Sequence, residues 1–229
     1  MSEGKIRKIQ SFVRRSGRLT LGQKYGLNEL WANYGIDPIN HEILNFDSLF
    51  AKPQAVILEI GFGNGDSLLQ MAINEPEYNF LGIEVYEAGV GRLINEAHKH
   101  NLSNLKIIKQ DAVEVLKNNI AANSLAGFQL YFADPWHKKK HHKRRIVQAE
   151  FMHLMSAKLM NGGFVHMATD WQNYAEHMLQ TLEAHAHFKN TLGAHIYSPR
   201  PERRPITKFE KRGERLGHGV WDLIFTNEK

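Results

Sequence analysis

The chain of 229 residues contains no cysteine. Disulfide scaffolds, thiolate zinc sites, iron–sulfur clusters and cysteine nucleophiles are therefore excluded. Long apolar runs are missing too, since none approaches the roughly 18 residues that a transmembrane helix requires. The N-terminal segment lacks the apolar stretch of a secretory signal. A chain of this size buries about 70% or more of its unfolded surface, so we expect a globular, cytoplasmic protein that folds without staples.

Acidic residues are scarce in three segments, 1–24, 136–145 and 198–217. These segments hold 20 of the 29 Lys and Arg but only 4 of the 24 Asp and Glu. Such separation of charge indicates a polyanionic partner, with nucleic acid first and anionic membrane second. Three basic loops without a partner remain an alternative. For residues 1–24, a basic arm and a mitochondrial transit peptide both fit the Arg- and Ser-rich, acid-poor composition.

Short apolar runs alternate with helical patterns from residue 55 onward. The predicted strands cover 55–63, 79–85, 105–111, 128–136, 164–170 and 219–227, with helices between the earlier ones. Strands alternating with helices indicate crossover connections and a parallel sheet. We therefore expect one α/β domain over residues 1–229, with a basic N-terminal arm over about residues 1–24 and connecting or weakly helical structure from there to Pro53.

Three glycines follow the first predicted strand, in the run Gly61-x-Gly63-x-Gly65. Gly61 and Gly63 allow a tight turn and close approach of a ligand, and Gly65 allows close helix packing. The spacing differs from the G-x-G-x-x-G of NAD-binding proteins, and Glu59 stands two residues before the first glycine. A carboxylate there is unfavourable beside a pyrophosphate, but it suits a ligand that carries an ammonium and a sulfonium.

Carboxylates also follow the next three strands, where a doubly wound sheet binds its ligand. Glu84 lies 23 residues after Gly61, the spacing at which an acidic side chain accepts ribose hydroxyls. Asp111 is placed to meet an adenine edge or a neighbouring backbone group, and Asp134 ends the fourth strand. With Glu59, this register predicts S-adenosylmethionine as the cofactor.

A basic run follows Asp134 directly. Asp134 can accept hydrogen bonds from the N–H groups of a base, and the lysines and arginines beyond it would hold phosphates. Trp136 has two open roles, stacking on a base or packing in the pocket wall. His137 and His141 have the spacing of a metal pair, but no third ligand accompanies them, so no metal is expected.

Asp170 ends the fifth strand, where it would face the same cleft as Asp134 or cap the following helix. Residues 200–213 form a Pro-punctuated, Arg-rich segment before the last strand. Long loops of this kind are commonly functional clamps.

The sequence closely resembles the bacterial tRNA (guanine-N7-)-methyltransferase family. The shared motifs are E-I-G-F-G-N-G, F-L-G-I-E-V, D-P-W-H-K-K-K-H-H-K-R-R, T-K-F-E-K-R-G and L-G-H-G-V-W-D-L. The resemblance runs from about Arg15 to Phe225, and D-P-W-H-K and T-K-F-E are its most specific elements. One residue departs from the pattern: the family usually has Pro before the Asp of D-P-W-H, where this chain has Ala133.

The resemblance implies a Rossmann-like, doubly wound, mostly parallel seven-stranded sheet and methylation of the variable-loop guanine at tRNA position 46. Asp134 is the implied catalytic residue. The implied cofactor-binding residues are Glu59, Gly61, Gly63, Gly65, Glu84, Asp111 and Asp134. The implied substrate-binding residues are Lys138, Asp170, Thr207, Lys208, Phe209 and Glu210. The implied RNA-binding residues are Lys140, His141, His142, Lys143, Arg144 and Arg145.

Two other functions remain open. One is an S-adenosylmethionine-dependent methyltransferase for another RNA base, and the other is a non-catalytic RNA-binding protein with a Rossmann-like fold. The acidic strand ends favour an enzyme, and a dehydrogenase fits the glycine spacing least. We expect tRNA as the partner, without binding to a membrane or to an obligate protein partner. The protein is expected to be a monomer or a homodimer.

Overall fold

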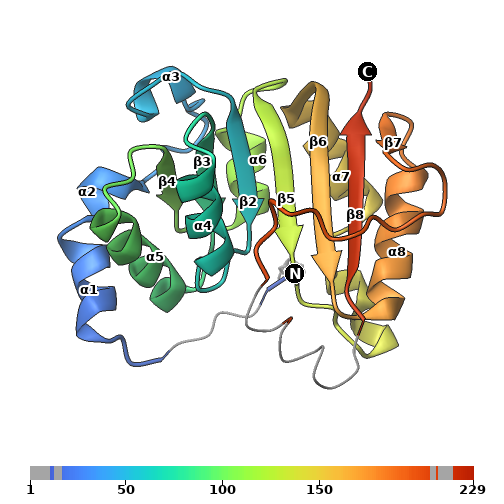
Figure 1. Cartoon of the computed structure of the whole chain (residues 1–229), viewed down its shortest axis with the longest axis horizontal. Helices are drawn as coiled ribbons and strands as arrows, with labels where there is room; N and C mark the ends of the chain where they lie inside the picture. The colour runs from blue at the N-terminus through green and yellow to red at the C-terminus, as the bar shows by residue number, and fades with distance from the viewer. Residues whose placement is uncertain (1–10, 13–16, 207–209, 211–218) are drawn as a thin grey trace, which may run out of the picture.

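The computed structural model describes residues 11–12, 17–206, 210 and 219–229. Within these residues the chain forms one eight-stranded sheet with helices on both faces (Figure 1). The strands are β1 (Gly35–Ile36), β2 (Val56–Ile60), β3 (Asn79–Ile83), β4 (Leu105–Ile108), β5 (Leu125–Tyr131), β6 (Leu159–Thr169), β7 (Phe188–Asn190) and β8 (Trp221–Asn227). The helices are α1 (Leu21–Asn28), α2 (Trp31–Tyr34), α3 (Phe46–Leu49), α4 (Asp66–Asn74), α5 (Glu87–Lys99), α6 (Ala112–Asn118), the 3₁₀ helix η1 (Lys139–Arg144), α7 (Ala149–Lys158) and α8 (Gln172–Glu183). No described helix is long and apolar enough to cross a membrane.

The strand order is β1-β4-β3-β2-β5-β6-β8-β7. Strands β1 to β6 pair in parallel, whereas β8 pairs antiparallel with β6 and β7. The chain moves outward from β2 through β3 to β4, then returns to place β5 and β6 on the other side of β2. This reversal puts the topological switch point between β2 and β5, where open α/β sheets bind their ligands.

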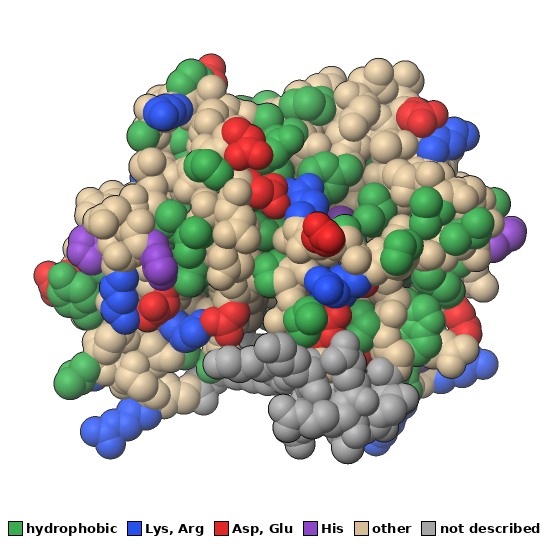
Figure 2. All heavy atoms as spheres, viewed as in Figure 1, with side chains coloured by type: hydrophobic (Ala, Val, Ile, Leu, Met, Phe, Trp, Pro, Cys, Tyr) green, Lys and Arg blue, Asp and Glu red, His purple; other side chains and the backbone are tan. Residues whose placement is uncertain are grey.

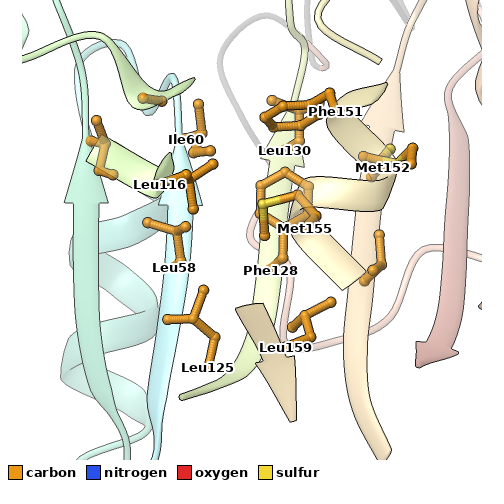
Figure 3. Packing of buried hydrophobic residues seen from close by; sticks show 14 of the residues in the cluster. Leu58, Ile60, Leu116, Leu125, Phe128, Leu130, Phe151, Met152, Met155 and Leu159 are labelled. Atoms are coloured by element: carbon orange, nitrogen blue, oxygen red, sulfur yellow. The ribbon is translucent and has the colours of Figure 1, made fainter. Parts of the chain in front are cut away.

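Two clusters of buried side chains fill the two faces of the sheet. Strand residues alternate between them, as β geometry requires: Ile57 and Phe80 point to the side of α4 and α5, whereas Leu58 and Leu81 point to the side of α6, α7 and α8. Figure 3 shows the second cluster, in which side chains of α6 and α7 meet the strands: Leu58, Ile60, Leu116, Leu125, Phe128, Leu130, Phe151, Met152, Met155 and Leu159. Helix α5 buries Val90, Leu93, Ile94 and Ala97, the stripe expected of an amphipathic helix.

The structure confirms the predicted α/β class and corrects several details. The described sheet has eight strands, which are the six predicted from the sequence pattern and the short strands β1 and β7, instead of the seven that the resemblance implied. Strand β5 begins and ends earlier than predicted, so Asp134 lies in the loop after it. Helices α1 and α2 form where connecting or weakly helical structure was expected, because Thr20 and Gln23 make a capping box that starts α1 inside the presumed arm.

Candidate active site

The glycine loop joins β2 to α4 at the switch point. Gly61, Gly63 and Gly65 all have positive φ, at 73°, 57° and 77°, a conformation that other residues rarely adopt. A Cβ added at Gly61 or Gly63 would meet nothing within 4 Å, whereas one at Gly65 would lie 2.8 Å from the Leu93 side chain. The first two glycines therefore border open space, and the third packs against α5, as the sequence predicted.

Helix α5 holds this loop from one side. Arg92 donates a hydrogen bond to the carbonyl oxygen of Asn64 across 2.7 Å and pairs with Asp66 at 2.6 Å. Gly89 lies so close to the loop that an added Cβ would overlap the carbonyl oxygen of Gly63. The turn is therefore fixed by backbone packing before any ligand arrives.

Glu84 follows β3 and braces the same loop. Its Oε2 accepts a hydrogen bond from the Gly63 amide at 2.8 Å, and its Oε1 accepts from the amides of Val85 and Tyr86 at 2.6 and 2.9 Å. A carboxylate offers about four acceptor positions, so these three bonds leave it little further capacity. Glu84 thus orders the glycine loop.

Glu59 is buried beneath the loop, on the β2 face that carries Ile57. The residue is 2% exposed, and its Oε2 is without a hydrogen-bond partner. Burial, followed by the negative charge of Glu84, raises the pKa of Glu59 to about 8. An unpartnered buried acid is costly, so this site favours a cationic or hydrogen-bond-donating ligand.

Asp111 lies three residues beyond the end of β4, not at the strand end that the sequence predicted. It occupies the N-cap position of α6, where its Oδ1 accepts a hydrogen bond from the Val113 amide at 3.0 Å. Capping fixes the half-buried side chain at the carboxyl edge of the sheet.

Asp134 is exposed, in a loop whose backbone is strained on both sides. Phe132 and Trp136 have φ of 53° and 49°, and bulky residues adopt such values only when the surroundings impose them. Strain of this kind costs about 1–3 kcal/mol per residue and concentrates at functional sites. No composition or periodicity in the sequence marks this strain.

Arg145 holds the loop from below. Its Nε donates to the Pro135 carbonyl oxygen at 2.9 Å, and its Nη2 donates to Oδ1 of Asn173 at 2.7 Å. The guanidinium also lies over the Tyr174 ring, 4.8 Å from its centre, and the residue is 3% exposed. The predicted contact of Arg145 with RNA therefore does not match its buried position, which makes it a support for the Asp134 loop.

Trp136 is packed rather than freely presented. The Arg144 guanidinium lies 3.9 Å above its ring, His141 meets it edge-on, and its Nε1 donates to the Ser11 carbonyl oxygen at 3.3 Å. Of the two roles left open, these contacts favour packing. The neighbouring Lys138, Lys139, Lys140 and Lys143 are exposed along η1 and the residue before it. On the face seen in Figure 2, by contrast, basic and acidic side chains are interspersed.

Asp170 follows β6, and the residue after it, Trp171, contacts His137 of the segment that follows Asp134. The rings of His137 and Trp171 are 4.2 Å apart between centres, which joins the two segments. The N-cap position of α8 is Trp171, so Asp170 does not cap that helix as the alternative reading expected. Asp170 is half-buried at the carboxyl edge.

Comparison with known proteins places this arrangement in a family. Residues 53–223 match a family described as putative methyltransferase. A tRNA (guanine-N(7)-)-methyltransferase from Psychromonas ingrahamii is 56% identical over 220 residues, covering 96% of this chain and 90% of the relative. The tRNA (guanine-N(7)-)-methyltransferase from Shewanella amazonensis is 54% identical, and the alignment covers 96% of this chain and 92% of that relative. The chain belongs to the tRNA (guanine-N(7)-)-methyltransferase family. The resemblance seen in the motifs is thereby confirmed.

Two solved structures share the fold. The 16S rRNA methyltransferase KamB aligns with a TM-score of 0.60 at 16% identity, covering 83% of this chain and 100% of KamB. The tRNA (m1A58) methyltransferase TrmI from Aquifex aeolicus aligns with a TM-score of 0.50 at 16% identity, covering 95% of this chain and 73% of TrmI. At these identities the likeness supports the Rossmann-like fold alone.

The T-K-F-E motif of the tRNA (guanine-N(7)-)-methyltransferase family falls mostly outside the described residues, since Thr207, Lys208 and Phe209 are not among them. Glu210 is described and is 2% exposed, with both carboxylate oxygens accepting hydrogen bonds from Arg204. The predicted substrate contact of Glu210 is therefore at odds with its buried position.

Several residues around the site were missed by the sequence analysis. Arg204 is fully buried, and Asn173 accepts a hydrogen bond from Arg145, yet no motif or pattern in the sequence marked either residue. His166 offered one usable signal, because a lone polar residue inside the apolar strand F-V-H-M-A indicates a buried hydrogen bond. That bond exists: His166 contacts Tyr131 and Asp222, each at 2.8 Å.

Proposed function

We propose that the protein transfers a methyl group from S-adenosylmethionine to N7 of the guanine at position 46 of tRNA, forming 7-methylguanosine. The observation that carries the proposal is the unpartnered carboxylate of Glu59, buried beside Glu84 under two glycines that border open space. Glu59 and Glu84 at the switch point would accept hydrogen bonds from a cationic ligand, and a cation would favour ionisation of Glu59. Family membership supplies the expected substrate.

The residues present fit S-adenosylmethionine. Glu59 would accept hydrogen bonds from its ammonium group, and the bare backbone at Gly61 and Gly63 gives it room. Glu84 would accept from the ribose with the capacity that its three backbone bonds leave, and Asp111 lies at the adjoining strand edge. When bound, the cofactor supplies an electrophilic methyl group on a sulfonium.

Asp134 acts on the guanine in this proposal. Guanine N7 has an in-plane lone pair and needs no base to deprotonate it, so the protein's contribution is positioning and electrostatics. Methylation leaves a cationic purine whose N1–H and exocyclic amine become stronger donors. Asp134, together with Asp170, accepts those bonds and stabilises charge that grows toward the transition state. Adenine is disfavoured because it presents an acceptor where guanine presents N1–H.

The exposed lysines of the basic run bind the tRNA backbone. Lys139, Lys140 and Lys143 point charge into solvent beside the Asp134 loop, and Lys138 leads into them from that loop. Phosphate contacts fix the register of the RNA without reading its sequence. With tRNA as the substrate, the cytoplasm is the expected place of action.

The two rival functions predict different products. A methyltransferase for another base would label a different nucleoside, and a non-catalytic binder would retain tRNA without transfer. The buried, unpartnered carboxylate oxygen of Glu59 and the strained loop at Asp134 favour catalysis, because pure RNA binding requires neither.

The test combines purified protein, unmodified tRNA transcript and labelled S-adenosylmethionine, followed by digestion to nucleosides and mass spectrometry. We expect 7-methylguanosine, which disappears when the guanine at position 46 is replaced. A transcript changed at another variable-loop position is the matched control and should be methylated. Label in a different nucleoside overturns the target, and tRNA binding without transfer overturns catalysis.

A further inference from the structure

A network of buried polar side chains lies next to the loop that carries Asp134. This network joins β5, β6 and β8 to the segment that precedes β8. Its members are Tyr131, His166, Asp222, Arg204 and Glu210, and each side chain is at most 6% exposed. The Tyr131 hydroxyl contacts Nδ1 of His166, and Nε2 of His166 contacts Asp222, each at 2.8 Å. Burial of so many polar groups is costly unless every one is bonded, and such networks specify a single arrangement.

Arg204 is at the centre of this network and is 0% exposed. Its Nε and Nη2 donate to the two oxygens of Asp222 at 2.7 and 2.9 Å. Its Nη1 and Nη2 donate to the two oxygens of Glu210 at 2.7 and 2.6 Å. One planar guanidinium therefore binds two carboxylates in bidentate fashion, a geometry that lysine cannot reproduce.

Arg204 also touches the point where the Asp134 loop leaves the sheet. Its guanidinium carbon is 5.6 Å from the centre of the Phe132 ring and 6.0 Å from that of Tyr131. Phe132 carries the positive φ that starts the loop, and its amide donates to the Ala168 carbonyl oxygen at 2.8 Å. The same guanidinium thus contacts the first residue of the loop and the last residue of the T-K-F-E motif.

We infer that Arg204 is a positioning residue for methyl transfer, which holds Glu210 and the Phe132 end of the Asp134 loop in fixed relation without touching the substrate. Glu210 then belongs to this support and does not contact the guanine. The inference rests on the proposed function, because the reaction that it serves is the one proposed above.

The test is a double-mutant cycle with Arg204→Lys, Glu210→Gln and the double variant, assayed for methylation of the tRNA transcript beside the unaltered protein. Rates are expressed per cofactor-binding site, so that unfolded protein does not count. Each single variant should lower kcat about tenfold to a hundredfold, the loss expected for a charge-assisted hydrogen bond. The dissociation constant of S-adenosylmethionine should stay within about twofold, because neither residue borders the glycine loop.

The double variant separates support from substrate contact. If Glu210 acts through Arg204, the double variant loses no more activity than the worse single variant. If Glu210 binds the guanine by itself, the two losses multiply and the inference is overturned. Equal losses in kcat and in cofactor affinity would also overturn it, since they indicate general damage to the fold.

The neighbouring arginine gives a matched control. Arg203 pairs with Glu75 at the end of α4 at 2.6 Å and stacks over Phe164, so it anchors the same segment elsewhere. Arg203→Lys should leave kcat within about twofold of the unaltered protein. If Arg204→Lys does not fold, the cycle is run with Asp222→Asn and Glu210→Gln, because Asp222 and Glu210 both accept hydrogen bonds from Arg204. Absence of 7-methylguanosine with the unaltered protein would instead refute the proposed function, and this inference with it.

Discussion

Arg145 donates a hydrogen bond to the carbonyl oxygen of Pro135 across 2.9 Å, and through it a buried guanidinium reaches the residue next to Asp134. The same guanidinium binds Asn173 and lies over Tyr174, both on α8. The strained Asp134 loop is therefore fastened to the helix that follows Asp170.

Arg145→Lys is expected to lower both turnover and stability. A lysine keeps the positive charge but carries its three donors on a single nitrogen, so it does not reproduce the separate Nε and Nη2 positions from which Arg145 bonds Pro135 and Asn173. Loss of these part-buried bonds to a charged group should cost about 1.5–3 kcal/mol of unfolding free energy, measured by urea denaturation. The salt dependence of tRNA binding should stay unchanged. A flatter salt dependence would mean that Arg145 contacts phosphate after all.

Lys140→Ala and Lys143→Ala are expected to weaken tRNA binding and leave turnover at saturating tRNA unchanged. Each exposed lysine that neutralises a phosphate should contribute about 0.7–0.9 to the slope of log affinity against log salt. Filter binding at several salt concentrations measures that slope. Lys117→Ala, an exposed lysine on α6 outside the basic segments, is the control and should change nothing. Unchanged slopes for both Lys140→Ala and Lys143→Ala would remove the basic run from the RNA interface.

Asp134→Asn is expected to cut turnover by about a hundredfold to a thousandfold, the size of effect that removal of one electrostatic group produces in other active sites. Asparagine keeps the shape but loses the charge that stabilises a cationic product. Affinity for S-adenosylmethionine should change much less, as equilibrium binding would measure. If turnover survives and only cofactor affinity falls, Asp134 is a binding residue and the catalytic assignment fails.

The sequence predicts this site well where residue type and strand order suffice. The glycine loop, Glu59 and Glu84 were placed correctly, because parallel strands bring their carboxyl ends to one edge. Burial of individual polar residues was not predictable in this way. Arg145 was predicted to contact RNA and Glu210 to contact the substrate, whereas tertiary packing brings them to their partners Asn173 and Arg204. Positive φ at Phe132 and Trp136 left no trace in composition or periodicity.

Cofactor binding is expected to be coupled to a proton at Glu59. Burial and then Glu84 raise the pKa of Glu59 to about 8, so the free protein carries a neutral acid at pH 7. A cationic ligand favours the ionised form, so binding at pH 7 should release a proton. Affinity for S-adenosylmethionine should therefore rise with pH up to about 8, by at most about tenfold per pH unit, and then level off.

Glu59 should also make the stability of the free protein depend on pH, in the direction opposite to that of the cofactor affinity. Between the ordinary pKa of 4.5 and about 8 the folded state binds more protons than the unfolded state, so unfolding free energy falls as pH rises through that window. Glu59→Gln should remove both dependences. Calorimetry in buffers of different ionisation enthalpy measures the released proton directly. No release at pH 7 would show that Glu59 does not ionise against the cofactor.

Helix α1 is expected to depend on two glycines where it crosses α5. A Cβ at Gly26 would overlap the carbonyl oxygen of Gly91, and one at Gly91 would overlap that of Gln23, so the two backbones are in direct contact. Gly91→Ala must push the helices apart, at about 1–3 kcal/mol of unfolding free energy. Gly22→Ala is the control on α1, because its Cβ would meet only the Asn95 side chain at 3.4 Å. That variant should be neutral or stabilising by up to about 1 kcal/mol.

The consequence for function follows from what α1 carries. The basic segment 1–24 runs into this helix, so displacement of α1 by Gly91→Ala should weaken tRNA binding as well as stability, whereas Gly22→Ala should alter neither adversely. Binding is measured well below the unfolding transition, so that the two effects are read separately. If Gly91→Ala loses stability yet binds tRNA normally, the docking of α1 is a structural matter alone and the basic segment works without it.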